Sequence, residues 1–219
     1  MTPKVVRRRE LCIVARNREG GNMHGLIFTE LKKYVEAKYN GDTWQTLLEQ
    51  AGLNHQLYLA SAVYPDGDAL ALIGTASQVT GISAALLLED FGQFILPNLI
   101  QQYRFLVKPS WGLLDFLENT EETIHKIMRF HKGVAPPRLR THRLGENKLI
   151  ITYDSARKMC PLLKGMVKGS ARAYEQEITI MESRCMLQGD PECNVTVQVE
   201  TAGVHPSSNA FQRAVAPNR

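Results

Sequence analysis

Apolar residues recur at helical spacing through the first half of the chain. Between Met23 and Leu99 they repeat about every 3.6 residues, which predicts four helices. Gly81 interrupts the last two and is the expected break between them. The expected helices lie around Leu26–Tyr34, from Thr43 to just before Gly52, over Ala69–Val79 and over Ala84–Leu99.

The second half of the chain changes period. β-branched residues in near alternation predict strands over Lys148–Tyr153, Glu177–Met181 and Asn194–Val199. Met159–Tyr174 returns to helical spacing between the first two strands. Helices followed by a strand-rich end predict an α+β fold, helical at the N-terminal end and closed by an antiparallel sheet.

The length and composition fit one globular domain with short additions. The chain has 219 residues, of which 44% are hydrophobic and 22% are charged, as in ordinary folded proteins. We expect an N-terminal extension over 1–22, the folded domain over 23–200 and a tail over 201–219. No run approaches the roughly 18 apolar residues of a membrane helix, and the start has no cleavable signal, so we expect a soluble, cytoplasmic protein.

The excess of basic over acidic residues lies at the two ends of the chain. The formal net charge is +4, but the middle, 23–200, carries 18 basic and 20 acidic residues. A nucleic-acid-binding protein presents its basic residues as a patch on a folded face. The charge distribution therefore argues against a nucleic-acid partner.

One histidine has a defined place on the longest amphipathic segment. Trp111–Phe130 predicts a helix, and at about 100° per residue His125 falls at the edge of its apolar arc, beside Leu114. A neutral imidazole there can bind a metal or a haem iron. A boundary histidine without a special role is the alternative, and His131 is the local competitor as ligand.

A second cluster follows the first predicted strand. Side chains two residues apart on a strand share a face, so Tyr153, Ser155 and Arg157 are expected in one row. Two hydroxyls and a guanidinium are suited to binding a carboxylate or phosphate. An ordinary polar strand end is the alternative.

Together these features resemble the haem nitric oxide/oxygen-binding (H-NOX) domains, relatives of the haem domain of soluble guanylate cyclase. The resemblance covers about 23–199 and rests on short motifs that occur in the order typical of the family. They are Met23-His24-Gly25, Leu72–Ser77, Asp90-Phe91-Gly92, Phe116–Asn119 and the pentapeptide Tyr153–Arg157.

The resemblance implies a helical N-terminal subdomain and a C-terminal four-stranded antiparallel sheet with helices, with haem b as the cofactor between them. It identifies His125 with the iron ligand and Tyr153, Ser155 and Arg157 with the residues that hold the haem propionates. Ile27 and either Pro136 or Pro137 match residues that press on the porphyrin and distort it. Ile124 replaces the leucine that usually precedes the histidine.

The resemblance also bears on which gas binds. A donor stabilises O2 on ferrous iron by about 1 to 3 kcal/mol, whereas NO needs none. Oxygen-binding members have a tyrosine where this chain has Leu162, and Ile95 aligns with another pocket position. We therefore expect binding of NO, and more weakly of CO, in preference to O2.

The expected output is conformational rather than catalytic. In the family, NO weakens the iron–histidine bond, and the histidine helix and the porphyrin relax. The 19 tail residues hold no effector domain. We expect a bacterial gas sensor whose separate effector is a histidine kinase or a cyclic-dinucleotide enzyme.

Three of the four cysteines form another candidate centre. Cys160 begins the helix after the pentapeptide, and Cys185 and Cys193 flank Gly189-Asp190-Pro191, a predicted hairpin turn. Some H-NOX proteins carry a cysteine-rich zinc site in the sheet subdomain. No fourth ligand is evident in the sequence: Glu182 is the nearest candidate, and Cys12 lies in the extension. Reduced thiols without metal remain an alternative.

Two other functions fit the sequence less well. The first is a haem-free sensor of the same fold that detects oxidants through zinc and the three thiolates of Cys160, Cys185 and Cys193. The second is an enzyme with a cysteine or histidine nucleophile. No cysteine lies beside an evident base, and no phosphate-binding loop or triad pattern is present, which argues against the enzyme.

Overall fold

The computed structural model describes residues 21–39 and 41–200 of the chain. These residues form two compact units, and the boundary between them falls between Leu88 and Glu89, inside helix α4. Residues 1–20 and 201–219, which include Cys12, most of the expected extension and the whole expected tail, lie outside the described residues.

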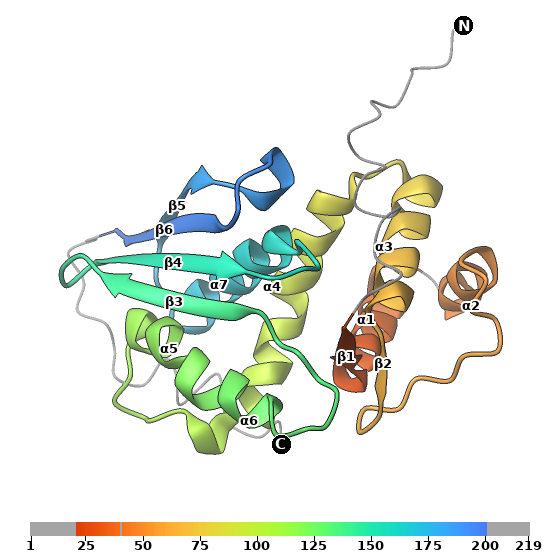
Figure 1. Ribbon diagram of the computed structural model, residues 1–219, viewed down its shortest axis with the longest axis horizontal. Helices are drawn as coiled ribbons and strands as arrows, with labels where there is room; N and C mark the ends of the chain where they lie inside the picture. The colour runs from red at the N-terminus through yellow and green to blue at the C-terminus, as the bar shows by residue number, and fades with distance from the viewer. Residues whose placement is uncertain (1–20, 40, 201–219) are drawn as a thin grey trace, which may run out of the picture. The chain divides into compact units, whose positions relative to one another are not determined.

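The first unit contains the predicted N-terminal helices (Figure 1). Its elements are β1 (Asn22–His24), α1 (Gly25–Lys38), α2 (Gly41–Gln50), β2 (Val63–Pro65), α3 (Asp66–Thr80) and the start of α4 (Ala84–Gln102). The helix predictions are confirmed to within a few residues at their ends. The short antiparallel pair β1–β2 was not predicted, because three residues are too few to show a period.

Aromatic rings form the core of the first unit. Phe28 stacks on Tyr58 with ring centroids 4.3 Å apart, and Tyr64 meets Phe28 edge-on at 5.4 Å. The Gly25 amide donates to the Ala62 carbonyl at 2.7 Å. A Cβ at Gly25 would lie 1.9 Å from the Leu59 carbonyl oxygen, so the start of α1 requires glycine.

Gly81 ends α3 as the sequence predicts. Its φ of 70° is left-handed, and its amide donates to the Ser77 carbonyl at 3.0 Å, as in a helix C-cap. Within the described part of the chain, no single helix is long and apolar enough to cross a membrane. Helices α3 and α4 meet those criteria only jointly, and they are bent by 112° relative to each other.

The second unit is built on a four-stranded antiparallel sheet in the order β3-β4-β6-β5. The strands are β3 (Arg138–Arg143), β4 (Lys148–Asp154), β5 (Ile178–Arg184) and β6 (Cys193–Val199). The helical segments are the rest of α4, η2 (Arg104–Leu106), α5 (Leu113–Asn119), η3 (Glu121–His125), α6 (Lys126–Met128), α7 (Cys160–Ala173) and η4 (Met186–Gln188). The predicted α+β class and antiparallel sheet are confirmed.

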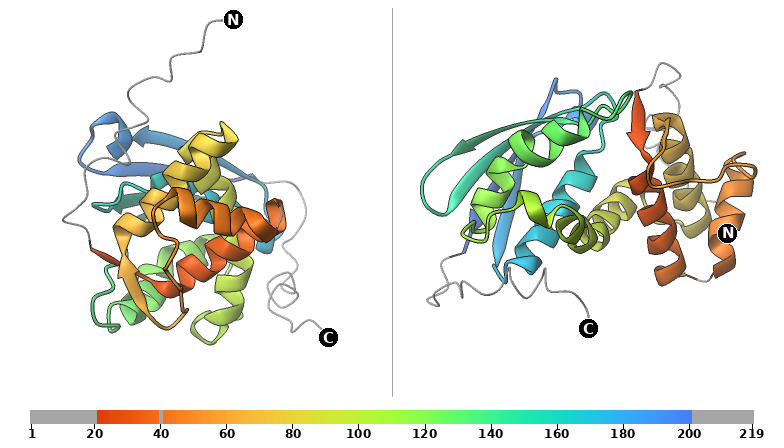
Figure 2. Two further views of the ribbon diagram at one scale, coloured as in Figure 1. Left: turned by 90° about the vertical axis from the view of Figure 1, so that its right-hand side faces the viewer. Right: turned by 90° about the horizontal axis from the view of Figure 1, so that it is seen from below.

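One face of this sheet forms the core of the second unit. Alternate residues of β4 and β6 are buried, as expected of strands covered on one side. Helices α5 and α7 pack on that face (Figure 2). The buried strand residues are Leu149, Ile151, Tyr153, Cys193, Val195 and Val197.

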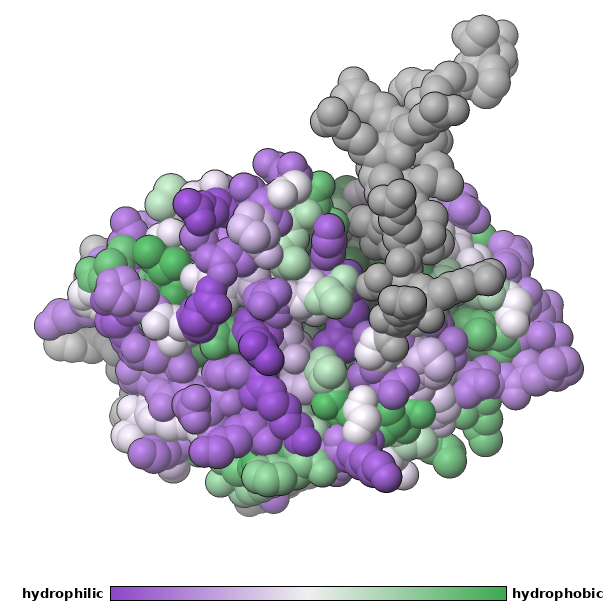
Figure 3. Space-filling model, viewed as in Figure 1, coloured by the Kyte–Doolittle hydropathy of each residue, from purple (hydrophilic) through white to green (hydrophobic). Residues whose placement is uncertain are grey.

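The four-stranded sheet agrees with the expectation from the resemblance, but the position of the edge strand β3 was not predicted, because its sequence is dominated by arginine. Its outward residues Arg138, Arg140 and His142 are exposed, and hydrophilic side chains predominate on this face of the unit (Figure 3). Its inward row faces α5: the Thr141 hydroxyl donates to the Glu118 carbonyl at 3.5 Å, and Arg143 binds the Glu118 carboxylate at 2.8 Å. Charge on an edge strand also disfavours pairing with other chains.

The prediction of a single helix over Trp111–Phe130 is wrong. It is not one regular helix: α5 ends at Asn119, a π-helical turn spans Glu121–His125, and α6 ends at Met128. The His125 amide donates to the Thr120 carbonyl five residues back, at 3.1 Å. Because a π turn holds one more residue than an α turn, an angle of 100° per residue no longer gives the direction of His125.

Helices α4 and α7 cross at close range in the second unit. A Cβ on Gly165 would lie 2.0 Å from the Glu89 carbonyl oxygen, and one on Gly92 would lie 2.5 Å from the Leu162 carbonyl oxygen. These neighbours are backbone atoms, which cannot move aside as a flexible side chain can. The crossing therefore depends on both glycines.

We expect Gly165→Ala to lower the free energy of unfolding by about 3 kcal/mol or more, the upper end of the range for overpacking. Urea denaturation followed by circular dichroism measures the loss. Gly67→Ala is the control, because Gly67 lies in α3 with open space around it and should cost nothing. Equal stability of the Gly165→Ala protein and the wild type would show that the helices do not cross this closely.

Candidate functional site

His125 lies at the end of the π turn, with its ring hydrogen-bonded to Glu121. Nδ1 of His125 is 2.9 Å from Oε2 of Glu121, and the two side chains are only 17% and 19% exposed. A carboxylate accepts the proton of Nδ1–H, which leaves the lone pair of Nε2 available to a metal. Sequence reasoning found the histidine and missed its partner.

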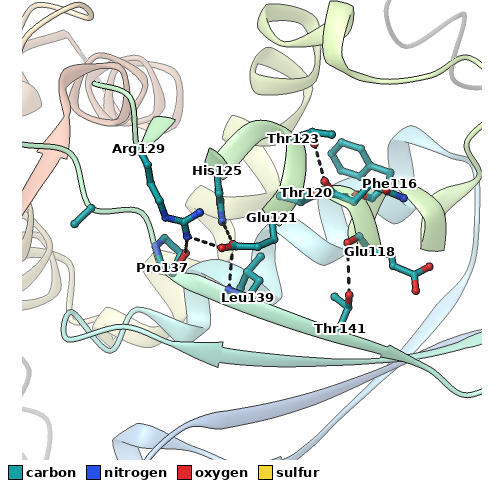
Figure 4. Close-up of polar contacts among 12 residues, drawn as sticks. Phe116, Glu118, Thr120, Glu121, Thr123, His125, Arg129, Pro137, Leu139 and Thr141 are labelled. Atoms are coloured by element: carbon teal, nitrogen blue, oxygen red, sulfur yellow. Dashed lines mark hydrogen bonds and ion pairs between the residues drawn. The ribbon is translucent and has the colours of Figure 1, made fainter. Parts of the chain in front are cut away.

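Glu121 has two further donors. Nη2 of Arg129 lies 2.5 Å from Oε1, and the amide of Leu139 in β3 lies 3.2 Å from Oε2 (Figure 4). Burial alone would raise the pKa of the Glu121 carboxyl, but the hydrogen bonds from His125, Leu139 and Arg129 outweigh it and lower that pKa. The spacing of four residues between Glu121 and His125 was the available signal in the sequence.

The row predicted for Tyr153, Ser155 and Arg157 needs a correction. Strand β4 ends at Asp154, and Ser155 and Arg157 lie in the turn that follows. The three residues still gather, since the Arg157 amide donates to Oγ of Ser155 at 3.3 Å and the Tyr153 phenol is hydrogen-bonded to Ser155. A turn brings them together where a strand would have spaced them along one face.

The buried Tyr153 phenol stays protonated at neutral pH. Burial raises its pKa to about 12, although the Ser155 hydrogen bond and the Arg157 charge act in the opposite direction. It is therefore a hydrogen-bond donor to an anion. Together with the Ser155 hydroxyl and the Arg157 guanidinium, it forms a donor set suited to a carboxylate.

One short segment links the histidine to this donor set. The Arg157 guanidinium donates to the Ala135 carbonyl, and Arg129, which binds Glu121, donates to the Pro137 carbonyl at 3.2 Å. Residues 135–137 thus contact both parts of the site. An imidazole with a free Nε2 and a donor set for carboxylates fit a haem, which carries a metal and two acidic arms.

The other predicted haem-contacting residues are apolar. Ile95 in α4 is fully buried, and Leu162 in α7, Pro136 and Pro137 are half-buried in the second unit. Ile27 is half-buried on α1 in the first unit. Since Ile95 and Leu162 have no side-chain donor, neither can hydrogen-bond a gas molecule.

A second cluster joins the three described cysteines with Glu182. The ligand atoms of Cys160, Glu182, Cys185 and Cys193 all lie within 4.8 Å of one another, and the Sγ atoms of Cys160 and Cys185 are 3.7 Å apart. The thiols are free rather than disulfide-bonded. Burial and the neighbouring thiols raise the pKa of Cys160, so without a cation this thiol stays protonated.

The loop that brings Cys185 and Cys193 together differs from the predicted tight turn. It contains the helical turn η4, and Gly189 has a φ of 106°. The Asp190 carboxylate accepts a hydrogen bond from the Cys185 amide at 2.8 Å, which closes the loop. The hairpin between β5 and β6 is nevertheless antiparallel, as expected.

The carboxylate of Glu182 has a hydrogen-bond partner for only one of its two oxygens among the described residues. Its Oε2 accepts from Nζ of Lys164 at 3.2 Å, while its Oε1 is buried and lacks a hydrogen-bond partner among the described residues. A buried carboxylate oxygen without a partner costs about 1 to 3 kcal/mol or more. A cation held by Glu182 and the three cysteines would remove that cost.

Comparison with known proteins gives one family. A profile of the Haem-NO-binding family matches residues 24–182. The chain is 24% identical over 181 residues to soluble guanylate cyclase gcy-37 and 24% identical over 168 residues to gcy-35, both of Caenorhabditis elegans. These matches cover 78% and 72% of this chain but only 25% and 24% of the cyclases, so the chain spans about a quarter of their length.

Solved structures show the same fold. An H-NOX protein from S. oneidensis in the Fe(II)NO state matches with a TM-score of 0.76 and 22% identity, over 82% of this chain and 100% of that one. An Fe(II) unliganded H-NOX protein from K. algicida matches with a TM-score of 0.75 and 19% identity, over 84% of this chain and 100% of that one. The similarity therefore extends over both units.

Proposed function

Because the chain belongs to the Haem-NO-binding family, whose domain is a gas sensor and not an enzyme, we propose that it holds haem b and detects NO through iron ligated by His125. The observation that carries the proposal is the arrangement in the second unit. His125, with its Nδ1 engaged, and the donor set of Tyr153, Ser155 and Arg157 are joined through residues 135–137.

In this proposal each part of the site has a separate task. When bound, the haem supplies an iron that takes up diatomic gases and a flat apolar ring with two carboxylates. Nε2 of His125 would coordinate the metal, and Tyr153, Ser155 and Arg157 would bind the carboxylates through charge-assisted hydrogen bonds. The family resemblance proposes Ile27 and either Pro136 or Pro137 as the apolar residues that would contact the ring.

We expect His125→Ala to abolish the Soret band of the native protein or to shift it markedly, because the iron loses its protein ligand. Absorption spectra after expression with added haem precursor measure this, and added imidazole should restore the band. The matched control is His131→Ala, since His131 is the competing candidate for the iron ligand. His131 is exposed, so this variant should leave the spectrum unchanged. If His131→Ala instead of His125→Ala alters the spectrum, the ligand is assigned incorrectly.

Gas selection follows from the apolar character of Leu162 and Ile95. O2 depends on a hydrogen-bond donor from the protein far more than NO does, and neither side chain has one. The proposed order is therefore NO, then CO, with O2 disfavoured.

We expect the reduced protein in air to form no stable complex with O2, and Leu162→Tyr to raise O2 affinity about tenfold, equivalent to about 1.4 kcal/mol. Stopped-flow absorption measures the on- and off-rates. Leu162→Phe is the control, since it has nearly the same size and lacks the hydroxyl. Equal O2 affinity in the two variants would contradict a role for a donor at this position.

The signal is proposed to begin with the release of His125. His125 would take different positions with NO-bound and with gas-free haem, and a difference in free energy between the two would bias the equilibrium between two conformations of the chain. An effector of the histidine kinase or cyclic-dinucleotide class in a bacterial cell would respond to this change. The family resemblance supports this effector class.

A second candidate function concerns zinc. Cys160, Glu182, Cys185 and Cys193 offer one carboxylate and three thiols, and tetrahedral Zn–S bonds of about 2.3 Å place sulfurs about 3.8 Å apart. The observed 3.7 Å between two of the thiols and the unpartnered oxygen of Glu182 favour it. Zinc would accompany haem, or it would serve alone as a thiolate redox sensor in a reducing, cytoplasmic compartment.

We expect about one zinc ion per chain after purification without chelator, and a loss of that zinc in Cys185→Ser, because three ligands remain where four are needed. Inductively coupled plasma mass spectrometry measures the metal. Cys12→Ser is the control and should keep the zinc. Full zinc content in Cys185→Ser, or none in the wild type, would exclude this site.

A further inference from the structure

Glu121 is the most heavily engaged carboxylate near the proposed iron ligand. One oxygen accepts from His125 and from the Leu139 amide, and the other accepts from Arg129. Figure 4 shows these three groups converging on the carboxylate, His125 and Arg129 from its own helical segment and Leu139 from β3. An ordinary exposed ion pair four residues apart on a helix engages none of the backbone of a neighbouring strand.

We propose that Glu121 is a positioning residue that holds the His125 ring, fixes Nε2 as the coordinating nitrogen and strengthens it as an iron ligand. This inference rests on the proposed function, since it assigns a task to a residue beside the proposed ligand. Outer-shell carboxylates hydrogen-bonded to a ligating imidazole fix its tautomer and raise its basicity.

Burial makes the effect of this carboxylate larger than at the surface. The His125 and Glu121 side chains are 17% and 19% exposed, so water screens their interaction poorly. A full negative charge beside Nδ1 draws its proton and increases electron density on Nε2. Electron donation through the axial ligand is one of the ways in which a protein sets the potential of a haem.

Arg129 moderates this charge. Its guanidinium contacts the Glu121 carboxylate and the Pro137 carbonyl. The guanidinium therefore offsets part of the negative charge that the Glu121 carboxylate presents to His125. Removing the guanidinium should increase the influence of Glu121 on the imidazole, whereas removing the carboxylate charge should abolish it.

The test compares two variants that should act in opposite directions. In the haem-loaded ferrous protein, Glu121→Gln should lower the iron–histidine stretching frequency in the resonance Raman spectrum and raise the haem reduction potential. Arg129→Gln should shift both quantities the other way. Haem affinity of Glu121→Gln should fall about 10-fold, as for other losses of an outer-shell partner.

Glu122→Gln is the matched control. Glu122 is the next residue, it is 77% exposed, and its carboxylate lies 3.8 Å from Lys126. This variant should leave the frequency and the potential at the wild-type values. Its inclusion separates a specific effect of Glu121 from a general effect of removing one negative charge.

An unchanged frequency in Glu121→Gln, or shifts of the same sign in the two variants, would overturn the inference. If Glu121→Gln binds no haem, the Arg129→Gln result decides alone. These outcomes differ from failure of the proposed function, in which the wild-type protein binds no haem or keeps its spectrum in His125→Ala.

Discussion

The pairing of β3 with β4 in a single register holds the two parts of the candidate site together. Leu139 is opposite Tyr153, and Arg138 is opposite Asp154. On one side of this pairing the Leu139 amide binds Glu121 and thereby His125; on the other side Tyr153 begins the donor set that includes Ser155 and Arg157. A slip of one residue would turn Tyr153 out of the core and separate the two parts.

How much of the site the sequence predicts depends on whether each residue lies in a regular element. Helices α3, α4 and α7 and strands β4 and β6 repeat long enough for their period to show, and their predicted ranges agree with the structure. Tyr153 lies in such an element, and its burial follows from alternation. His125 could be selected as a candidate from its amphipathic segment, but its direction could not be derived.

The parts that sequence reasoning missed depend on contacts that are distant in the chain or irregular. The π turn at Glu121–His125 breaks the constant angle on which a helical projection relies. Strand β3 has an arginine-rich sequence that alternation cannot distinguish from a loop, and it is fixed by pairing with β4 and by the contact of Arg143 with Glu118. The cluster of Cys160, Glu182 and Cys185 was a candidate from the sequence, but its geometry depends on the packing of α7 beside β5.

The glycine motifs of the resemblance have a packing explanation in the structure. Gly25 begins α1 against the Leu59 and Ala62 carbonyls, and Gly92 faces the backbone of α7. Any larger residue would move a backbone segment rather than a side chain. Such positions accept only glycine, whereas most core residues can be exchanged for others of similar volume.

Side-chain hydrogen bonds support the irregular backbone around the π turn. The side chains of Asn119, Thr120 and Thr123 donate to carbonyls four residues back, at 2.8, 2.9 and 2.7 Å. These carbonyls therefore keep a hydrogen-bond partner even where the backbone hydrogen bonds of the helix are irregular. A rearrangement of the turn would leave few carbonyls without a partner, so its free-energy cost would be small. In the proposed sensor, a displaced His125 would pull first on Glu121. The hydrogen bonds of Glu121 with Leu139 and Arg129 then connect that displacement to β3 and to the Pro137 carbonyl, which gives a local change at the iron a physical route into the sheet.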